Sequence, residues 1–243
     1  MASHNVKGYQ AYGKVARTSQ HTGKATNALS LSSKHDITLF QETNFLDRED
    51  NQLKKILPPG YKAYYSCLNA NAAGVATVVS PTLASSHTIS KIPLPPLLQG
   101  YALCLRFTAS DGMAFTVLNV YLSSTSAAAR TEQIKNLHNS LPHTPFLIAG
   151  GDFNFVEDKF RDSSSQSAHY NTTKAFDKAW GDFKDKLDLK EVVQKSHTFF
   201  SGRSVDTTVS SRLDRFYLSY SETDWATVRP YAFIFSIPLP LIR

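Results

Sequence analysis

Short apolar runs that end in polar or turn-forming residues recur along most of the chain, and they predict β-strands. The runs are rich in Val, Ile, Tyr and Phe and are too short for buried helices. Ser110-Asp111-Gly112 separates two of the runs, and a turn of this Asp-Gly type is typical of an antiparallel hairpin. We therefore expect strands over residues 35–40, 61–68, 74–80, 101–108, 113–121, 147–151 and 212–219, with Gly150 and Gly151 marking the end of the sixth.

Other stretches carry apolar residues at helical spacing, with polar residues between them. They predict helices over residues 47–57, 127–141 and 174–189, and Pro58 and Pro142 end the first two because proline cannot continue a helix. The third stretch has an aromatic stripe that we interpret as core packing rather than a cofactor site. The apolar stripes are Leu53, Ile56 and Leu57; Ile134, Leu137 and Leu141; and Phe176, Trp180, Phe183 and Leu187.

The remaining segments are predicted to connect these elements. Asn5 and Gly8 come early, so the first strand looks clipped, and residues 9–33 are expected to hold a loop and a helix. Residues 158–173 and 195–211 read as loops, and the proline-containing apolar run 231–243 as an edge or unpaired segment. No repeat or linker divides the chain, so we expect one domain over residues 1–243.

Residues 147–155, Leu-Ile-Ala-Gly-Gly-Asp-Phe-Asn-Phe, are the most informative stretch. The apolar run stops at Gly150 and Gly151 and then presents Asp152 and Asn154, which alternate across one residue and would point the same way. Ligands of open α/β sheets gather at the carboxyl ends of strands, so these side chains are candidates for a site. The other interpretation is a plain strand-end turn in which Asp and Asn cap the next segment.

Composition narrows the function classes. The chain has 243 residues with 26 Lys plus Arg against 20 Asp plus Glu, giving a net charge of +6, and its pI near 9.2 suits polyanionic partners such as nucleic acid or phosphate esters. Cys67 and Cys104 are far apart and lack metal-ligand spacing, which argues against a disulfide framework or a zinc site and favours a reducing, intracellular location. No apolar run approaches the roughly 20 residues of a membrane span.

Polar side chains recur where the predicted strands end, and most of them carry oxygen donors. Mg²⁺ prefers carboxylate and water oxygens, usually with one or two protein carboxylates and a substrate phosphate. A further carboxylate can take a proton from water, and an amide or a phenol can stabilise charge on the phosphate. Taken singly, each residue is more often a cap or a turn residue, so their repetition at strand ends favours a site. They are Asn5, Glu42, Tyr121, Asp152, Asn154 and Asp214.

An ordered series of motifs resembles the endonuclease/exonuclease/phosphatase superfamily, and in particular the apurinic-type endonuclease domain of non-LTR (LINE-like) retrotransposons. A single motif of this kind is weak, whereas several in the right order are specific. The resemblance implies a DNase I-like, four-layer α/β sandwich in which two mixed sheets are flanked by helices. The motifs are Asn5-Val6-Lys7-Gly8, Gln41-Glu42-Thr43, Asn119-Val120-Tyr121, Gly151-Asp152-Phe153-Asn154 and Ser211-Arg212-Leu213-Asp214-Arg215.

The resemblance also implies a role for each strand-end residue. Glu42 would bind Mg²⁺ or Mn²⁺, and Asn5 would support the waters of the metal site. Asp152 would activate the attacking water. The amide of Asn154 and the phenol of Tyr121 would orient or stabilise the phosphate, while Asp214 would hold a histidine.

Two positions depart from the family pattern. Lys7 stands where some apurinic endonucleases have an acidic residue, although a basic residue is common there in retrotransposon versions. Family members also end in Ser-Asp-His, whereas an ungapped alignment places Ile237 and Pro238 at the Asp and His positions, and no histidine follows His197. Asp214 would then lack its histidine and could instead pair with Arg212 or Arg215.

These observations leave three functions open. The first is a metal-dependent DNA endonuclease, impaired in catalysis by Ile237 and Pro238. The second is a phosphomonoesterase or inositol-phosphate phosphatase of the same superfamily, and the third is a catalytically dead DNA-binding remnant. The resemblance further implies duplex DNA as partner, a monomer with no membrane association, derivation from a longer retroelement polyprotein, and a nuclear location if chromosomal DNA is the target.

Overall fold

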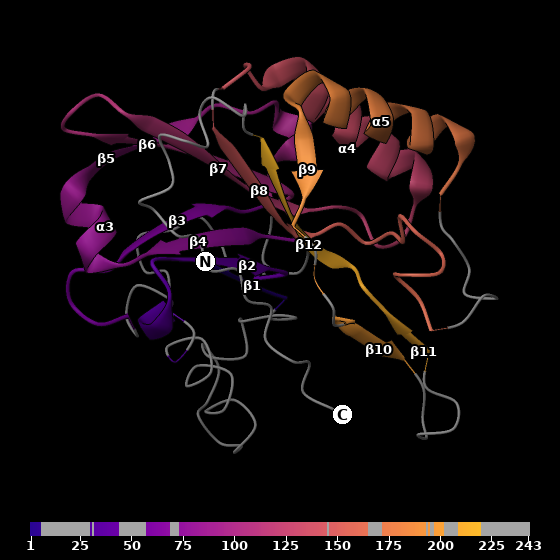
Figure 1. Cartoon of the computed structure of the whole chain (residues 1–243), viewed down its shortest axis with the longest axis horizontal. Helices are drawn as coiled ribbons and strands as arrows, with labels where there is room; N and C mark the ends of the chain where they lie inside the picture. The colour runs from indigo at the N-terminus through magenta and orange to yellow at the C-terminus, as the bar shows by residue number, and fades with distance from the viewer. Residues whose placement is uncertain are drawn as a thin grey trace.

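Two β-sheets pack face to face in the computed structural model of this chain, and helices cover the outer side of the larger sheet (Figure 1). The structure describes residues 1–5, 30, 32–43, 57–68, 73–144, 146–164, 172–192, 194, 197–201 and 209–219. Each of the two sheets combines parallel and antiparallel neighbours. The expected α/β sandwich with two mixed sheets is therefore confirmed.

The smaller sheet has four strands in the order β1-β2-β4-β3. β1 runs parallel to β2, and the other neighbours are antiparallel. Asn5 lies opposite Gln41, Gln41 opposite Val75 and Val75 opposite Ser66, so these four residues are level with one another at one edge of the sheet. The strands are β1 (Ala2–Asn5), β2 (Ile37–Gln41), β3 (Lys62–Ser66) and β4 (Val75–Val79).

The larger sheet has six strands in the order β5-β6-β7-β8-β12-β9. Only β7 and β8 pair in parallel, and α4 connects them. A separate two-stranded sheet consists of β10 (Phe199–Ser201) and β11 (Val209–Ser211). The strands of the larger sheet are β5 (His87–Ile92), β6 (Ala102–Ala109), β7 (Ala114–Tyr121), β8 (Leu147–Asp152), β9 (Leu189–Glu191) and β12 (Asp214–Ser219).

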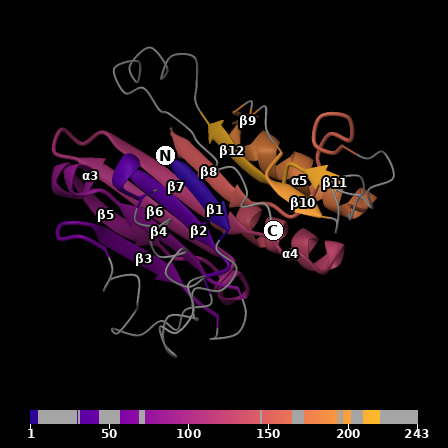
Figure 2. The ribbon, with the colours of Figure 1, turned by 90° about the horizontal axis from the view of Figure 1, so that it is seen from below.

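Apolar side chains fill most of the layer between the two sheets. Leu39 and Val75 from the smaller sheet pack with Ile148 and Phe216 from the larger one, and all four are excluded from solvent. Gly150 allows a close approach here, because a Cβ atom at this position would lie 2.4 Å from Cε1 of Phe216. Figure 2 shows β1 and β2 lying against β7 and β8, the strands whose ends carry the candidate site residues.

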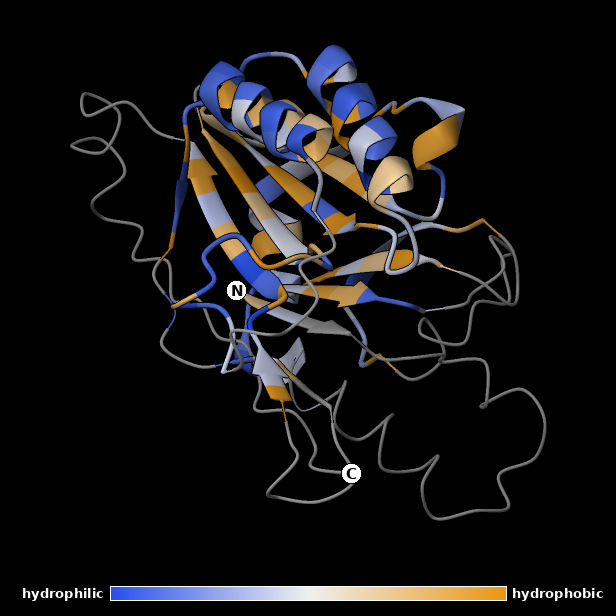
Figure 3. Ribbon diagram, turned by 90° about the vertical axis from the view of Figure 1, so that its right-hand side faces the viewer, coloured by the Kyte–Doolittle hydropathy of each residue, from blue (hydrophilic) through white to orange (hydrophobic). Residues whose placement is uncertain are grey.

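The helices α4 (Ala127–Ser140) and α5 (Lys174–Leu187) form the outer layer on the larger sheet. Ser126 and Thr173 cap them, each accepting a hydrogen bond from the backbone N–H three positions on, an interaction worth about 1 kcal/mol. Figure 3 shows that both helices turn polar residues outward and apolar residues toward the sheet. The buried residues of α4 are Arg130, Thr131, Gln133, Ile134 and Leu137, and those of α5 are Phe176, Ala179, Trp180, Phe183 and Leu187.

Each predicted strand, and each predicted helix that the structure describes, is present with small changes at its ends. The hydrophobic pattern did not predict α3 (Pro81–Ser86) or β5, and β5 is a half-exposed edge strand with His, Thr, Ser and Lys among its residues. The pattern also did not predict β9, which follows a left-handed turn at Asp188 (φ 47°). The strands β10 and β11 lie inside the segment 195–211, which was predicted as a loop.

The sequence pattern suggested that the strand ends at Gly150 and Gly151, and this prediction is wrong. β8 continues through both to Asp152, and the glycines serve close packing instead. Gly151 has φ 140°, and a Cβ there would lie 2.0 Å from the carbonyl oxygen of Val120. Only glycine fits this backbone at the end of the strand.

Other expectations fall outside the described residues. These include residues 47–56 of the predicted first helix, and with them the fourth layer of the sandwich, nearly all of the segment 9–33, and the apolar run 231–243. A single domain over residues 1–243 stays a prediction. In the part of the chain that the structure describes, no helix is both long and apolar enough to cross a membrane.

Candidate functional site at the shared edge of the two sheets

The carboxyl ends of β2 and β7 meet at one edge of the sandwich. The hydroxyl of Tyr121, the last residue of β7, donates a hydrogen bond to Oε1 of Glu42 at 3.1 Å. Glu42 directly follows β2 and has a left-handed backbone (φ 52°), so the chain turns at the point where its carboxylate faces Tyr121. This contact joins the two sheets at the site and brings together two of the predicted residues.

Asp152 and Asp214 lie level with Tyr121 in the larger sheet. Asp152 ends β8 and is opposite Tyr121 on one side and Asp214, the first residue of β12, on the other. Both carboxylates are buried. The sheet therefore places a phenol and two carboxylates side by side across three neighbouring strands.

Asn154 is held in a tight turn just beyond Asp152. Its backbone is left-handed (φ 52°), its N–H donates to Oδ1 of Asp152 at 3.0 Å, and its Nδ2 donates to the carbonyl oxygen of Leu122 at 2.9 Å. The predicted strand alternation across Phe153 is wrong, because β8 ends at Asp152. The turn interpretation is correct for the backbone, and this turn ties Asn154 to the segment that follows Tyr121.

Burial sets the protonation behaviour of the site. Burial, and then the neighbouring Asp152 carboxylate, raises the pKa of Asp214 well above its usual range, although a hydrogen bond from Thr198 opposes the shift. Burial, followed by the charge of Glu42, also raises the pKa of Tyr121, so its phenol remains a hydrogen-bond donor at neutral pH. The Tyr121 ring stacks on Tyr101, with centroids 6.1 Å apart.

Thr198 supports Asp214, and sequence reasoning missed it. Its Oγ1 accepts hydrogen bonds from the backbone N–H groups of Leu213 and Asp214, each at 3.0 Å. Thr198 immediately precedes β10, inside the predicted loop, where nothing in the sequence pattern marks it. In the part of the chain that the structure describes, Oδ1 of Asp214 is buried without a hydrogen-bond partner.

Arg212 and Arg215 form a buried ionic cluster with Asp162 rather than a pair with Asp214. Nε of Arg212 lies 2.9 Å from Oδ1 of Asp162, and Nη2 of Arg215 lies 3.0 Å from Oδ2. All three side chains are almost fully excluded from solvent. Burial favours the neutral acid, yet the charges of Arg215 and Arg212 lower the pKa of Asp162 to about 2.

The alternation of charged and apolar residues over 212–219 predicts Arg212, Asp214 and Phe216 on one face of the last strand, and this prediction is only partly correct. Arg212 precedes β12 and turns toward Asp162, the side on which Arg215 also lies. Phe216 packs between the sheets, two positions after Asp214, so these two residues share a face as predicted.

The donor set fits a hard cation in its chemistry. Glu42, Asp152 and Asp214 provide carboxylate oxygens, and Oδ1 of buried Asp214 has no hydrogen-bond partner among the described residues. No group of three or more His, Cys, Asp or Glu side chains in the described ranges is spaced to hold a metal by itself. Such a set suits Mg²⁺, which commonly keeps waters and substrate oxygens as its remaining ligands.

The structure describes some of the predicted positions only in part and others not at all. The backbone of Asn5 ends β1 beside Gln41, at the same edge as Glu42, while its side chain lies outside what the structure describes. Lys7, Ile237 and Pro238 lie outside the described residues altogether. The roles predicted for all six site residues thus stay predictions.

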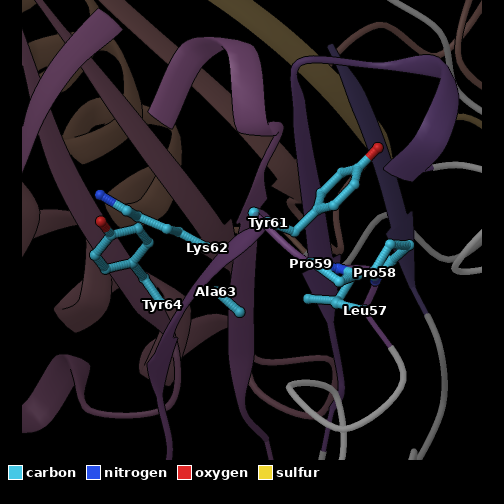
Figure 4. A pocket seen from close by; sticks show the side chains of 8 residues that line it. Leu57, Pro58, Pro59, Tyr61, Lys62, Ala63 and Tyr64 are labelled. Carbon is cyan, nitrogen blue, oxygen red and sulfur yellow. The ribbon is translucent and has the colours of Figure 1, made fainter. Parts of the chain in front are cut away.

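A hollow lies elsewhere on the smaller sheet, away from the candidate site. Residues 57–64 line a space of about 480 Å³ (Figure 4). Lys62 at its wall is opposite Val79, at the far end of β3 from Ser66, which is level with the candidate site. The lining has no carboxylate, so this hollow is separate from the site in both place and chemistry.

Comparisons with known proteins agree with the fold. The structure is similar to the endonuclease domain of TRAS1, a telomere-specific non-LTR retrotransposon, with 17% identity and a TM-score of 0.58 over 91% of this chain and 85% of that one. It is also similar to the 3′ phosphatase NExo from Neisseria bound to a product DNA hairpin (16% identity, TM-score 0.62, 90% and 85% covered). A third similar structure is an AP endonuclease from Archaeoglobus fulgidus (14% identity, TM-score 0.56, 82% of each chain).

No curated protein sequence gives a significant match. A family profile, in contrast, matches residues 2–235, nearly the whole chain, and this range includes every predicted site residue. The chain belongs to the endonuclease/exonuclease/phosphatase family.

Proposed function

We propose that this chain is a metal-dependent phosphodiester hydrolase of the DNA-endonuclease type. The observation that carries the proposal is the meeting of Glu42 with Tyr121 at 3.1 Å, next to Asp152 and Asp214 on adjacent strands. Carboxylates and a phenol at one sheet edge match the groups needed to activate water and to stabilise a phosphate.

Each residue has a role that its surroundings support. Asp152 is the base that takes a proton from the attacking water. Tyr121 is protonated at neutral pH, and burial raises its pKa further. Its single O–H proton, which Glu42 accepts in this structure, would turn to a phosphate oxygen when substrate binds. One N–H of the Asn154 amide is used by Leu122, and the other can donate to a phosphate oxygen.

Mg²⁺ or Mn²⁺ fits the oxygen donors of this edge, and Glu42 is the residue that would hold it, with Asn5 supporting its waters. Such a cation stabilises negative charge on a phosphate and lowers the pKa of bound water. Loss of Glu42 should then abolish dependence on added metal together with activity.

DNA is the proposed substrate for two reasons. The chain carries a net charge of +6, which favours binding to a polyanion. The similar structures include a retrotransposon endonuclease domain and an enzyme bound to a DNA hairpin. We further propose that the chain acts as a monomer on duplex DNA and derives from a retroelement polyprotein, with action in the nucleus where the target is chromosomal.

The test is nicking of supercoiled plasmid and of abasic-site duplex with Mg²⁺ or Mn²⁺. We expect nicking that EDTA stops and that falls at least about 100-fold in Asp152→Asn. The double variant Ile237→Asp/Pro238→His restores the family residues and should raise the rate about 100-fold if these positions limit catalysis. Absence of cleavage by both the parent and the restored chain would contradict the proposal.

A catalytically dead DNA-binding domain is a second candidate, because Ile237 and Pro238 replace the family Asp and His. It predicts binding to duplex DNA that weakens steeply with salt, without turnover in the parent chain. A phosphomonoesterase is a third candidate, since the 2′,3′-cyclic phosphatase ANGEL2 is also a similar structure (14% identity, TM-score 0.56, 93% and 88% covered). Release of inorganic phosphate from inositol phosphates or from 3′-phosphorylated DNA, with intact duplex left uncut, would favour it.

A further inference from the structure

A row of polar side chains crosses the apolar layer between the two sheets, directly behind the candidate site. Nε2 of Gln41 donates to Oδ1 of Asn119 at 2.8 Å, and Oε1 of Gln41 accepts from the hydroxyl of Ser3 at 3.2 Å. Nδ2 of Asn119 donates to the carbonyl oxygens of Ala76 at 2.8 Å and Phe40 at 3.3 Å. We call Ser3, Gln41 and Asn119 the inter-sheet polar row. All three residues are fully buried.

These bonds connect one sheet with the other. Asn119 belongs to β7 in the larger sheet, whereas its hydrogen-bond partners belong to β2 or β4 in the smaller sheet; they are Gln41, Phe40, Ala76 and Thr77. Apart from Thr77, most side chains around the inter-sheet polar row in this layer are apolar, and apolar contacts are non-directional. Hydrogen bonds have preferred distances and angles, so the row fixes how far β2 can slide against β7.

The inter-sheet polar row stands next to the two residues whose contact defines the site. Gln41 directly precedes Glu42, and Asn119 is two positions before Tyr121 on the same face of β7. A slide of β2 by a fraction of an ångström would therefore change the 3.1 Å contact between Glu42 and Tyr121. Catalytic groups must usually be held within about 0.5 Å of their productive positions.

We propose that Gln41 and Asn119 are positioning residues that set the register between the sheets and thereby hold Glu42 against Tyr121. The proposal rests on the proposed hydrolase function for its kinetic readout, but its structural readout does not. If Gln41 and Asn119 only stabilised the fold, it would be enough that every buried amide has a hydrogen-bond partner or is removed. A positioning role requires that these particular bonds be present.

The experiment compares Gln41→Met, Asn119→Leu and the double variant. Each single variant leaves a buried amide or carbonyl without its partner, and we expect its melting temperature to fall by several degrees. The double variant removes both amides, so it should regain part of that loss. Its kcat for plasmid nicking should nevertheless stay about 10- to 100-fold below the parent, with KM changed less than about threefold.

Thr116→Val is the matched control. Thr116 is a buried polar residue of the same strand, but it lies an odd number of positions from Asn119 and so occupies the opposite face of β7. We expect a change in melting temperature without a change in kcat. A drop in kcat equal to that of the double variant would show that β7 tolerates no polar-to-apolar change, and would overturn the proposal.

The second readout is independent of activity. In a sample with ring-labelled tyrosine, the Tyr121 signal is identified by its loss in Tyr121→Phe. We expect this signal to shift in the double variant, while the signal of buried Tyr217, on the helix side of the larger sheet, stays in place.

If the parent chain does not cleave DNA, the proposed function fails while the Tyr121 signal still tests positioning. An unchanged Tyr121 signal in a folded double variant would overturn the positioning proposal even if the parent is active. Recovery of parental kcat in the double variant would overturn it as well.

Discussion

Two sets of buried polar side chains lie near the candidate site, and they differ in charge. The inter-sheet polar row is neutral and joins the two sheets through amides, whereas the cluster of Asp162, Arg212 and Arg215 is charged and ties the loop after Asn154 to the start of β12. When two neutral amides that bond to each other are removed together, few buried donors or acceptors lose their partners. A charge removed from a buried cluster leaves its partners uncompensated in a medium of low polarity. The charged cluster should therefore tolerate change far less.

Asp162→Asn should have the largest effect. It removes the carboxylate that both buried guanidinium groups contact and leaves Glu191, 2.6 Å from Arg212 and 3.8 Å from Arg215, as their remaining ion-pair partner. We expect a loss of about 3–4 kcal/mol of unfolding free energy in urea titrations. Glu132→Gln is the control, because it removes an exposed ion pair with Lys135 and should cost less than about 0.5 kcal/mol. Similar losses in the two variants would mean that the buried cluster contributes no more than a surface pair.

Asn119→Leu should come next, with a loss of about 2–3 kcal/mol, since it deprives Gln41 and two backbone carbonyls of a partner. Adding Gln41→Met should cost less than the sum of the single losses. Urea unfolding of the four combinations gives the coupling energy directly. Strict additivity would contradict the view that the two amides act as a unit.

Low pH should distinguish the charged cluster from the inter-sheet polar row, because it should lower the free energy of unfolding by about 2 kcal/mol through Asp162. Asp162 has a pKa of about 2 in the folded chain against an ordinary value of 3.8, so its contribution is present above about pH 4 and is lost as the pH falls through about 2. Asp214 has the opposite sign, because its raised pKa lets folding favour the protonated form. Stability measured from pH 6 to pH 2 should fall equally in the parent and Asn119→Leu, and less steeply in Asp162→Asn.

Thr198→Val should have the smallest effect, about 1 kcal/mol, because two backbone N–H groups lose their acceptor. Thr198→Ser keeps the oxygen and should retain nearly full stability. The comparison of the two variants by thermal unfolding separates the hydroxyl from the methyl group. A loss confined to Thr198→Ser would point to packing of the methyl group instead.

The strand-end residues could be predicted from the sequence, whereas the inter-sheet polar row and the charged cluster could not. Glu42 follows a buried strand, Asp152 ends one and Asp214 begins one, and polar residues at such places are unusual enough to mark a site. Asp162 lies in a largely polar segment, so nothing in the sequence distinguishes it from its polar neighbours. Its importance comes from two arginines about fifty positions away.

The turn at Asn154 and the edge strand β5 show two further limits. A left-handed backbone at a non-glycine residue leaves no trace in a hydrophobic pattern, so the pattern suggested an extended strand there. β5 lies at the edge of its sheet with half of its residues exposed, and the alternation is weak because both faces meet some water. The alternation of apolar and polar residues that identifies a strand depends on one face being buried, so it is weak in strands that are largely exposed.

The parallel pair β7 and β8 has a consequence for how the site assembles. Tyr121 and Asp152 belong to one strand-helix-strand unit through α4, so their contact closes a short loop of chain. Glu42 lies 79 positions from Tyr121, and its contact requires the two sheets to pack against each other. Because distant contacts cost more loop entropy, we expect the Tyr121 and Asp152 side of the site to form early in folding and Glu42 to join it late.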